Sequence, residues 1–320
     1  MILLTGATGF IGKNLVPELA GDHALKILVR KTSNITPFLN LKNIKIVYGD
    51  LEKNMGIDDA LNNTELVIHC AARTIGRNYI EYYRMNTLGT AYLVQAMKKK
   101  GIKKILYLSS QAACGPATGK APLDESATPE PASFYGITKK QGEEIIIRNG
   151  LDYIILRPAA VYGPYDTEIL KYIKILNRGV CPIIGKSGKH LNFIYIKDLV
   201  QLIIRLISVR RFDKKLYFVN DGNCYSDEEI FGQISSLLKK KSIKIHISES
   251  IAFLCGLFND LFLPPSRRLI WRDKIKELSK KYWLCSNERL VREYGFTPAY
   301  TFKDGIRETI EWYQKNGLLR

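Results

Sequence analysis

The sequence predicts an α/β fold in which a doubly wound parallel sheet is joined to a smaller, mostly helical C-terminal domain. Through the first half of the chain, short runs rich in Ile, Leu, Val and Tyr alternate with longer segments of helical periodicity, a pattern typical of βαβ units. After about residue 165 this alternation weakens and helical patterns dominate. Neither an internal repeat nor a low-complexity linker divides the sequence, so we expect the second part to pack against the first.

Each expected element follows from its own run of residues. In the first half, strands are expected at 2–5, 26–30, 44–48, 65–70, 104–109 and 152–157, and helices at about 10–20, 79–100 and 133–149. Beyond them we expect a helix near 166–178, the strand FIYI at 193–196, the helix KDLVQLIIRLI at 197–207 and the strand LYFVN at 216–220. Ser226 and Glu229 form a capping box before a helix that reaches about 239. Gly295 is expected to end a helix ahead of a final one near 303–316.

Composition excludes several classes of protein. Of 320 residues, 46% are hydrophobic, which suits a sizeable core, and no apolar run reaches the roughly 18 residues of a membrane span. The sequence opens directly on an apolar run, so a cleaved signal peptide is not expected. Six cysteines without a CxxC pair and four dispersed histidines argue against a disulfide framework or a metal site. They indicate reduced thiols in the cytoplasm.

The formal net charge of +17 is compatible with an anionic substrate, nucleic acid or an acidic membrane surface. However, the lysine runs at 98–100 and 239–241 fall where helices are expected to end, and cations there complement the helix dipole. A nucleic-acid-binding motif is not found in the sequence. We therefore expect no nucleic-acid partner and interpret most of the charge as a solvated basic surface.

The stretch TGATGFIG follows the first expected strand and opens the first expected helix. In a strand–turn–helix unit, Gly6 allows a tight turn, Gly9 lets the backbone approach a pyrophosphate, and Gly12 lets the helix pack closely on the sheet. The N–H groups at the helix N-terminus can bind phosphates. A small-residue turn against a helix is the alternative, but the βαβ context favours a Rossmann-type dinucleotide site.

The end of the second expected strand bears on which dinucleotide is bound. The sequence there is LVRK, whereas an Asp or Glu would hydrogen-bond the ribose 2′-hydroxyl of NAD. Arg30 and Lys31 suit the 2′-phosphate of NADP instead, although they could simply form an exposed basic turn. The sequence thus favours NADP and leaves NAD possible.

A second constellation has the chemistry of proton transfer. Tyr135 and Lys139, in FYGITKK, are four residues apart and share one face of an expected helix. A free tyrosine has a pKa near 10, and a nearby ammonium group stabilises the phenolate and lowers that pKa. Ser110 ends the strand KILYLSS, and its hydroxyl could hold a substrate carbonyl oxygen beside the phenol. We expect these three residues to form the catalytic site.

TGATGFIG, SSQAACG and YGITK, in this order and at these separations, resemble the extended short-chain dehydrogenase/reductases, which form the NAD-dependent epimerase/dehydratase superfamily. Further matches are GDL at 49–51, HCAA at 69–72, MNTLGT around Asn86, LRPAAVYGP at 156–164 and FIYIKDL at 193–199. The resemblance covers nearly the whole chain.

The resemblance implies roles for individual residues. Tyr135 would be the catalytic acid/base, Lys139 would modify its pKa and bind ribose, and Ser110 would orient the carbonyl. Substrate contacts would include Gln111 and Tyr162. Besides Gly6, Gly9, Gly12, Tyr135 and Lys139, the cofactor contacts would be Phe10, Ile11, Arg30, Lys31, Asp50, Leu51, Ala71, Ala72, Arg73, Asn86, Pro158 and Val161.

The resemblance also implies a domain division and an assembly. Residues 1–165 and 189–225 would form the NAD(P)-binding Rossmann domain, and residues 166–188 and 226–320 the substrate-binding domain. Family members are often dimers through helices equivalent to those at 79–100 and 133–149, so a homodimer is possible.

Departures from the family pattern narrow the range of expected reactions and substrates. Dehydratases carry an Asp-Glu pair directly after the catalytic hydroxyl, whereas this chain has Gln111 and Ala112. Many nucleotide-sugar members carry Asn where this chain has Ala160, and an Arg that grips a pyrophosphate where it has Leu191. Each lost charge-assisted hydrogen bond is worth about 1.5–3 kcal/mol, although His190 or the basic surface could compensate.

The C-terminal stretch resembles the 3β-hydroxysteroid dehydrogenase-like and dihydroflavonol reductase-like branch, and also hopanoid-associated sugar-epimerase-like proteins. Its apolar segment IAFLCGLFNDLFLPP suits a hydrophobic substrate. Within 251–274 it could form a core helix, line an apolar pocket or lie on a membrane surface with basic residues facing the headgroups.

Together these observations predict an NAD(P)-dependent oxidoreductase, NADP favoured, that interconverts a secondary alcohol and a ketone in a largely apolar small molecule. The alternative is a nucleotide-sugar 4-epimerase with retained NAD, in which the same Tyr and Lys oxidise and re-reduce a sugar carbon. A third possibility is a non-catalytic NADP-sensing binding protein, although such a protein would not need Ser110, Tyr135 and Lys139.

Overall fold

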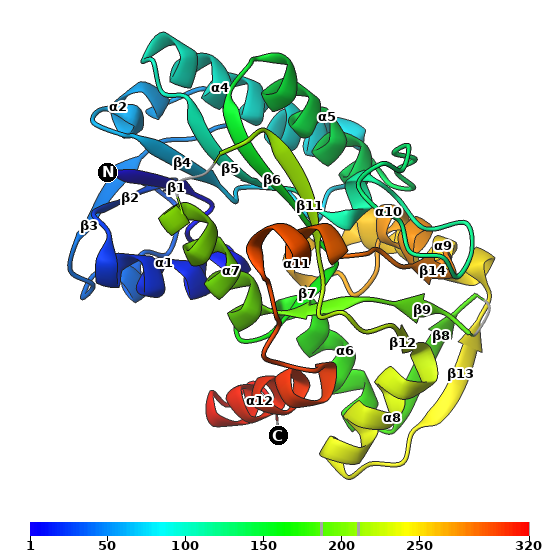
Figure 1. The fold of residues 1–320 in the computed structure, drawn as a ribbon. Helices are drawn as coiled ribbons and strands as arrows, with labels where there is room; N and C mark the ends of the chain where they lie inside the picture. Colours follow the sequence, from blue (N-terminus) through cyan, green and yellow to red (C-terminus); the bar gives the residue numbers. More distant parts are fainter. Residues whose placement is uncertain (186–187, 210–211, 320) are drawn as a thin grey trace.

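A computed structural model describes residues 1–185, 188–209 and 212–319. Its centre is a sheet of seven strands in the order β3-β2-β1-β4-β5-β6-β11, with every neighbouring pair parallel (Figure 1). The order reverses at β1 and β4, which is the switch point where open α/β sheets bind ligands. The strands are β1 (Ile2–Thr5), β2 (Leu25–Val29), β3 (Ile44–Tyr48), β4 (Leu66–His69), β5 (Lys104–Leu108), β6 (Asp152–Pro158) and β11 (Lys215–Val219).

Helices cover both faces of this sheet, as a doubly wound fold requires (Figure 1). Leu4 and Ile68 point into the hydrophobic cluster beneath α1 (Phe10–Asp22) and α7 (Ile196–Val209). Their strand neighbours Leu3 and Val67 belong to the cluster on the opposite face. That second cluster lies beneath α2 (Ile57–Leu61), α4 (Gly89–Lys99) and α5 (Phe134–Arg148). The predicted fold class is confirmed.

The helix expected at 79–100 contains a change of winding. It begins as α3 (Tyr79–Tyr82), passes through a π-helical turn η2 (Tyr83–Leu88) and continues as α4. π-Helical turns are rare and occur often at functional sites. This turn carries Asn86, one of the predicted site residues.

Beyond β6 the chain builds small sheets and helices below the main sheet (Figure 1). The short strand pairs are β7 (Ala160–Tyr162) with β10 (Phe193–Tyr195), and β8 (Val180–Ile184) with β13 (Ile243–Ile247). A third small sheet joins β12 (Tyr225–Ser226), β9 (His190–Leu191) and β14 (Tyr282–Trp283). The helices are α6 (Thr167–Asn177), α8 (Asp227–Leu238), α9 (Glu249–Phe262), α10 (Arg272–Leu278), α11 (Glu288–Tyr294) and α12 (Phe302–Lys315).

The start of α8 and the end of α11 have the local structure that the sequence predicted. Ser226 and Glu229 make both bonds of the capping box at the start of α8. Gly295 ends α11 with a φ of +58°, in the left-handed region that favours glycine. Within the described residues, no helix is long and apolar enough to cross a bilayer. The proposed domain boundaries stay a prediction.

Candidate active site

The glycine-rich turn brings three backbone segments into close contact at the end of β1. Gly6 has a φ of +80°, and a Cβ added there would lie 2.6 Å from the backbone nitrogen of Ala71. A Cβ at Gly12 would lie 2.3 Å from the Gly6 carbonyl oxygen. Only glycine fits either position without movement of the backbone, so β1, α1 and the end of β4 meet without side chains between them.

The N-terminus of α1 is left open to an anion. Gly9 is its N-cap, so no side chain caps the helix, and its first turn has no acidic residue. Lys13 is the first residue whose N–H bonds back, to the Gly9 carbonyl. The N–H groups of Phe10, Ile11 and Gly12 precede that bond and carry the positive end of the helix dipole. This backbone cradle at the switch point fits the pyrophosphate of a dinucleotide.

Asn86 joins the segment after β4 to the helix α5. Its Oδ1 accepts from Arg73 N at 2.7 Å, and its Nδ2 donates to Arg73 O at 3.1 Å and to Thr138 Oγ1 at 3.0 Å. The side chain is buried and all of these polar atoms are bonded within the protein. The Arg73 guanidinium pairs with Glu52 at 2.7 Å. Asn86 therefore supports the backbone beside the candidate site, and the cofactor contact that the resemblance implies for it stays a prediction.

The remaining predicted cofactor residues lie at the ends of neighbouring strands. Arg30 and Lys31 follow β2 and are exposed, whereas Leu51 is buried beside Gly89. The Asp50 carboxylate accepts from Glu52 N at 2.9 Å, which shapes the turn after β3. The others in this region are Ala71 and Ala72 directly after β4, Pro158 at the end of β6 and Val161 in β7.

The geometry brings Tyr135 beside Ser110. Ser110 follows β5, and its hydroxyl accepts from Ala112 N at 3.1 Å. Tyr135 lies in the first turn of α5, and a Cβ at the neighbouring Gly136 would lie 2.2 Å from the Ala112 carbonyl oxygen. This contact holds the start of α5 against the loop that carries Ser110.

The surroundings of Tyr135 raise the pKa of its phenol to about 12. Burial contributes most, and the negative charge of Glu277 adds to it. A hydrogen bond with Ser110 and the positive charge of Lys274 act in the opposite direction. The phenol is therefore protonated at neutral pH, in a position to donate to an oxygen held beside Ser110.

Lys139 is buried and engaged elsewhere in this arrangement. Its Nζ donates to the Leu108 carbonyl at 2.7 Å and lies 4.0 Å from the centre of the Tyr107 ring. Burial lowers the pKa of Lys139 to about 7, although Glu143 raises it in part. Glu277 and Glu168 raise the pKa of Tyr135, and Lys274 lowers it. That Lys139 lowers this pKa during catalysis stays a prediction.

A buried ion pair fixes α5 on the sheet behind Lys139. Arg157 Nε and Nη2 bind the two oxygens of Glu143 at 2.9 and 2.7 Å, and the Ser109 hydroxyl donates to the same carboxylate. Such a bidentate contact is directional as well as charged. The pair joins β5, β6 and α5. Lys139 lies one turn before Glu143 on α5, so the pair also fixes the position of Lys139 relative to the sheet.

The sequence analysis missed the helix α10, which closes the site from the other side. Asp273 accepts from Phe134 N at 2.7 Å and from Tyr135 N at 3.1 Å, so a carboxylate from α10 caps the tyrosine's helix. Glu277 accepts from the Ser133 hydroxyl at 2.6 Å and pairs with Lys274 at 3.1 Å. These contacts join residues about 140 positions apart, and no local pattern in the sequence indicates them.

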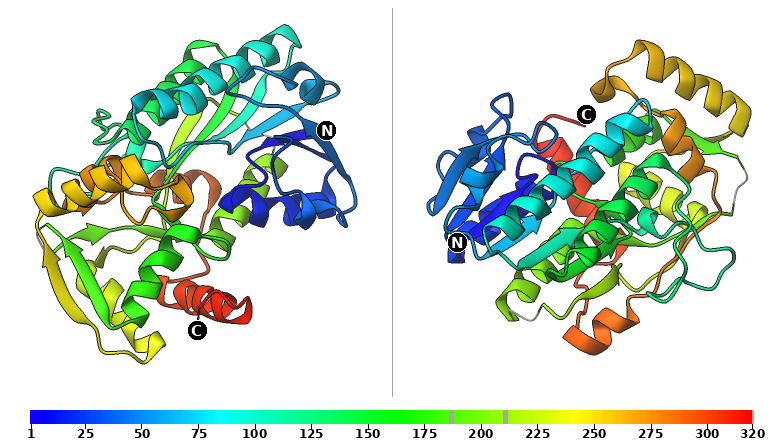
Figure 2. Two further views of the ribbon diagram at one scale, coloured as in Figure 1. Left: turned by 180° about the vertical axis from the view of Figure 1, so that it is seen from behind. Right: turned by 90° about the horizontal axis from the view of Figure 1, so that it is seen from above.

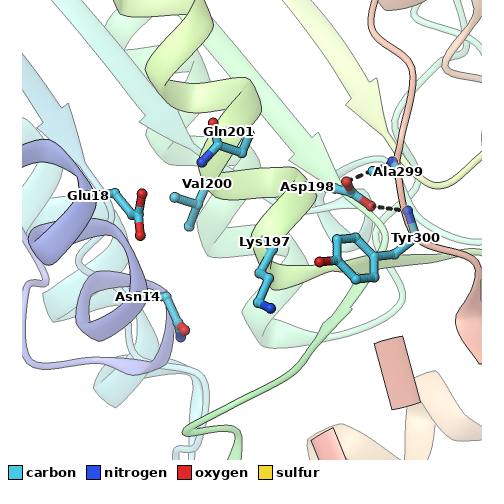
Figure 3. Close-up of a pocket in the computed structure, with 8 residues that line it drawn as sticks. All are labelled: Asn14, Glu18, Lys197, Asp198, Val200, Gln201, Ala299 and Tyr300. Atoms are coloured by element: carbon cyan, nitrogen blue, oxygen red, sulfur yellow. Dashed lines mark hydrogen bonds between the residues drawn. The ribbon is translucent and has the colours of Figure 1, made fainter. Parts of the chain in front are cut away.

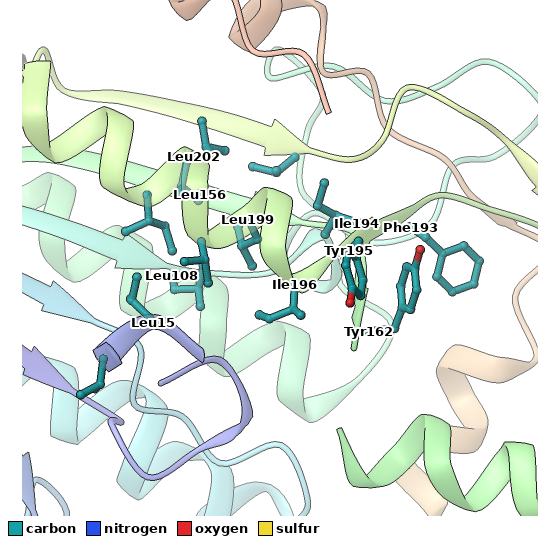
Figure 4. Close-up of a cluster of buried hydrophobic side chains, with 14 of the residues drawn as sticks. Leu15, Leu108, Leu156, Tyr162, Phe193, Ile194, Tyr195, Ile196, Leu199 and Leu202 are labelled. Carbon is teal, nitrogen blue, oxygen red and sulfur yellow. The ribbon is translucent and has the colours of Figure 1, made fainter. Parts of the chain in front are cut away.

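The two predicted substrate residues have different surroundings. Gln111 is 4% exposed, and its Nε2 has no hydrogen-bond partner among the described residues, so an acceptor from a ligand could satisfy it. Tyr162 is 2% exposed and packs among Phe193, Tyr195 and Phe302 (Figure 4). Its hydroxyl donates to a main-chain carbonyl at 3.3 Å. The ring of Tyr162 therefore completes the hydrophobic core, and a substrate contact at this residue stays a prediction.

Leu191 and Ala160, where many nucleotide-sugar members carry Arg and Asn, lie on two small strands. Leu191, in β9, pairs with Tyr225 and Trp283 on its neighbours. The adjacent His190 stacks on Tyr282, with ring centres 5.7 Å apart. The ring of His190 therefore packs within this small sheet.

A separate pocket of about 310 Å³ lies between α1, α7 and the segment before α12 (Figure 3). The Asp198 carboxylate in it accepts from Ala299 N and Tyr300 N. None of the predicted site residues lines this pocket. Among the described residues, no group of three or more His, Cys, Asp or Glu could hold a metal ion.

Comparisons with known proteins agree with this architecture. A UDP-glucose 4-epimerase of Vibrio cholerae is 27% identical over 97% of this chain and 94% of its own length. A ceramide reductase of Caulobacter vibrioides is 26% identical over 100% of this chain and 96% of its own. A solved structure of MoeE5 in complex with UDP-glucuronic acid and NAD superposes with a TM-score of 0.81 at 24% identity, covering 98% of this chain and 99% of that one.

The model of the NAD dependent epimerase/dehydratase family matches residues 2–219. That range includes the glycine-rich turn, Ser110, Tyr135 and Lys139. The matched range also spans the whole seven-stranded sheet. This chain is therefore an enzyme that belongs to the NAD dependent epimerase/dehydratase family.

Proposed function

We propose that this enzyme is a sugar 4-epimerase that acts on a nucleotide sugar and retains NAD between turnovers. The observation that carries the proposal is the composition of the site: Ser110 and Tyr135 lie together, while Gln111 and Ala112 replace the carboxylate pair of the dehydratases. The likeness to the epimerase of Vibrio cholerae supports the choice of reaction. The proposal replaces our first expectation, an oxidoreductase of apolar alcohols, as the leading function.

In this proposal the chain's own residues handle the proton of the sugar 4-hydroxyl. Ser110 orients the oxygen. Tyr135 would accept the 4-hydroxyl proton as the phenolate, and the phenol so formed would return that proton to the ketone oxygen in the second half of the cycle. Lys139, whose pKa is lowered to about 7 by burial, supplies a proton that exchanges near neutral pH. The nicotinamide, when bound, supplies the reversible acceptance of a hydride.

The proposed cofactor site is built around the open N-terminus of α1. The N–H groups of Phe10, Ile11 and Gly12 would bind the pyrophosphate, and Arg30 with Lys31 would lie near the adenosine ribose. We infer that residues 1–165 and 189–225 hold the cofactor and that the rest of the chain shapes the substrate pocket. A homodimer through α4 and α5 and a cytoplasmic location stay predictions.

A second candidate is the reduction of a ketone in an apolar molecule with NADPH. Leu191 and Ala160 favour it, because neither can bind a diphosphate. The likeness to a ceramide reductase also supports it. Here Arg30 and Lys31 would bind the 2′-phosphate of NADP.

The first experiment is to denature the purified protein and identify any dinucleotide released. For an epimerase we expect close to one NAD per chain, because the cofactor is regenerated in each cycle. Release of little cofactor, together with much tighter binding of added NADPH than of NADH, would overturn the epimerase proposal and favour the reductase.

A substitution tests the proposed role of Tyr135. Tyr135→Phe should keep dinucleotide binding and lower turnover about 10²- to 10⁴-fold, the usual contribution of a positioned acid/base. Tyr48→Phe is the control, because Tyr48 is exposed at the end of β3. Near-normal turnover of Tyr135→Phe would rule out the proposed mechanism, whereas dinucleotide binding without any turnover by the wild-type protein would be expected of a dinucleotide sensor.

A further inference from the structure

The helix α9 has its apolar face turned outward. The side packed on the protein consists of Ala252, Gly256 and Asp260, spaced four residues apart. Its exposed side carries large hydrophobic side chains that are 42–67% exposed. They are Ile251, Phe253, Leu254, Phe258, Leu261 and Phe262. A helix at a protein surface normally has the opposite arrangement, so this face is built to be covered by something apolar.

Close packing fixes α9 in this orientation. A Cβ at Gly256 would lie 2.6 Å from Ile275 Cδ1 and 3.0 Å from Arg272 N, so α9 rests directly against α10. Asp260, 3% exposed, binds Arg268 at 3.2 Å and Arg272 at 2.9 Å. Arg268 is fully buried. Rotation of the apolar face inward would leave these buried charges without partners.

Basic residues accompany the apolar face. The exposed face of α9 has no charged residue, since the helix contains only Glu249 at its start and Asp260 on its packed side. The segment that follows, 263–281, contains seven basic residues against two acidic ones. Of these, Arg267, Lys276, Lys280 and Lys281 are exposed. An apolar helix face followed in the sequence by a basic segment has the composition of an interfacial membrane-binding helix.

We propose that the exposed face of α9, defined as the six hydrophobic residues named above, binds the surface of an anionic lipid bilayer. In the right-hand view of Figure 2, α9 projects at the edge of the molecule, where a flat surface can reach it. The exposed basic residues of 263–281 would lie against the lipid headgroups. A second copy of this chain is a poorer occupant, because a two-fold interface would bring the two basic segments together.

This surface is close to the candidate active site. α9 packs on α10, and Asp273 of α10 accepts from Phe134 N and Tyr135 N. One short helix therefore separates the proposed bilayer surface from the start of the tyrosine's helix. Binding at α9 would place the substrate side of the enzyme at the membrane. The binding does not depend on which reaction the site performs.

Co-sedimentation with vesicles tests the proposal on the full chain. We expect the wild-type protein to sediment with phosphatidylcholine vesicles that contain phosphatidylglycerol, and to sediment far less with phosphatidylcholine alone. Phe258→Gln/Leu261→Gln should lower the partition coefficient at least tenfold. Leu39→Gln/Met55→Gln, which removes two similarly exposed hydrophobic side chains elsewhere, should bind like wild type. Unchanged circular dichroism shows that each variant is folded.

Four results would overturn the proposal. The first is wild-type protein that stays in the supernatant with anionic vesicles, and the second is undiminished binding of Phe258→Gln/Leu261→Gln. Equal binding to neutral vesicles would refute the assignment to an anionic surface. Sedimentation velocity gives the fourth, because a wild-type dimer that Phe258→Gln/Leu261→Gln converts to a monomer would make this face a subunit interface.

Discussion

The two sides of the candidate active site are built in different ways. On the cofactor side, the contacts come from backbone groups brought together by Gly6 and Gly12 within one strand–turn–helix unit. On the other side, Asp273, Lys274 and Glu277 reach the start of α5 from a helix far along the sequence. The cofactor side therefore depends on the absence of side chains, and the α10 side depends on charged ones.

The largest expected effect comes from adding a side chain on the cofactor side. Gly12→Val would place Cβ about 2.3 Å from the Gly6 carbonyl oxygen and push α1 away from the turn. If two charge-assisted bonds to phosphate are lost, at about 1.5–3 kcal/mol each, dinucleotide affinity falls at least about a hundredfold. Isothermal titration with NAD and NADPH measures it.

The control for this variant lies on the same helix. Gly21→Val adds the same side chain where no atom lies within 4 Å of a Cβ, so it should bind dinucleotide normally. Normal binding by Gly12→Val would show that this side of the site does not depend on the close approach.

Asp273→Asn tests the α10 side. The amide keeps one acceptor but loses the charge that faces two N–H groups of α5. Loss of a capping group costs about 0.5–2 kcal/mol, so the free energy of unfolding should fall by about 1 kcal/mol in urea denaturation. Asp22→Asn, at an exposed position, should change it by a few tenths at most. An equal effect of the two substitutions would contradict a capping role for Asp273.

Lys139→Met tests how much the buried ammonium group of α5 lowers the free energy of unfolding. Burial lowers the folded-state pKa of Lys139 from its ordinary value of 10.5 to about 7, so the unfolded chain binds more protons between these values. Wild-type stability should therefore rise as the pH increases from about 7 to about 10, and the variant should lack this contribution. At pH 7 the variant should be more stable by on the order of 1 kcal/mol. Parallel pH dependences would refute this assignment.

Glu277→Gln should have the smallest effect, and the quantity to measure is the proton affinity of Tyr135. Its negative charge raises the pKa of Tyr135, so removal of that charge should lower the pH at which the phenolate forms. The absorbance of the phenolate is followed by ultraviolet titration of Glu277→Gln and of the double variant Glu277→Gln/Tyr135→Phe. The difference between the two titration curves reports the pKa of Tyr135 alone. Glu288→Gln, exposed on α11, should leave the titration unchanged. A shift to higher pH in Glu277→Gln would contradict the proposed electrostatics.

Two apolar helices show how far sequence patterns reach. α7 and α9 are both 14 residues long and rich in Leu, Ile and Phe or Val. In α7 the apolar face packs on the sheet (Figure 4). For 251–274 the sequence left three alternatives open: a core helix, the lining of an apolar pocket and a segment on a membrane surface. The buried pair of Asp260 and Arg268, which turns the apolar face of α9 outward, is visible only in the folded chain.

The sequence by itself determined the sheet, the glycine-rich turn and the positions of Ser110, Tyr135 and Lys139. Each depends on periodicity or on residues within a few turns of chain, where spacing and geometry are directly linked. The tertiary structure decided that Tyr162 lies in the core, that Lys139 bonds to Leu108, and that α10 closes the site. These outcomes depend on which distant segments pack together, and packing is set by shape and buried charge across the whole molecule.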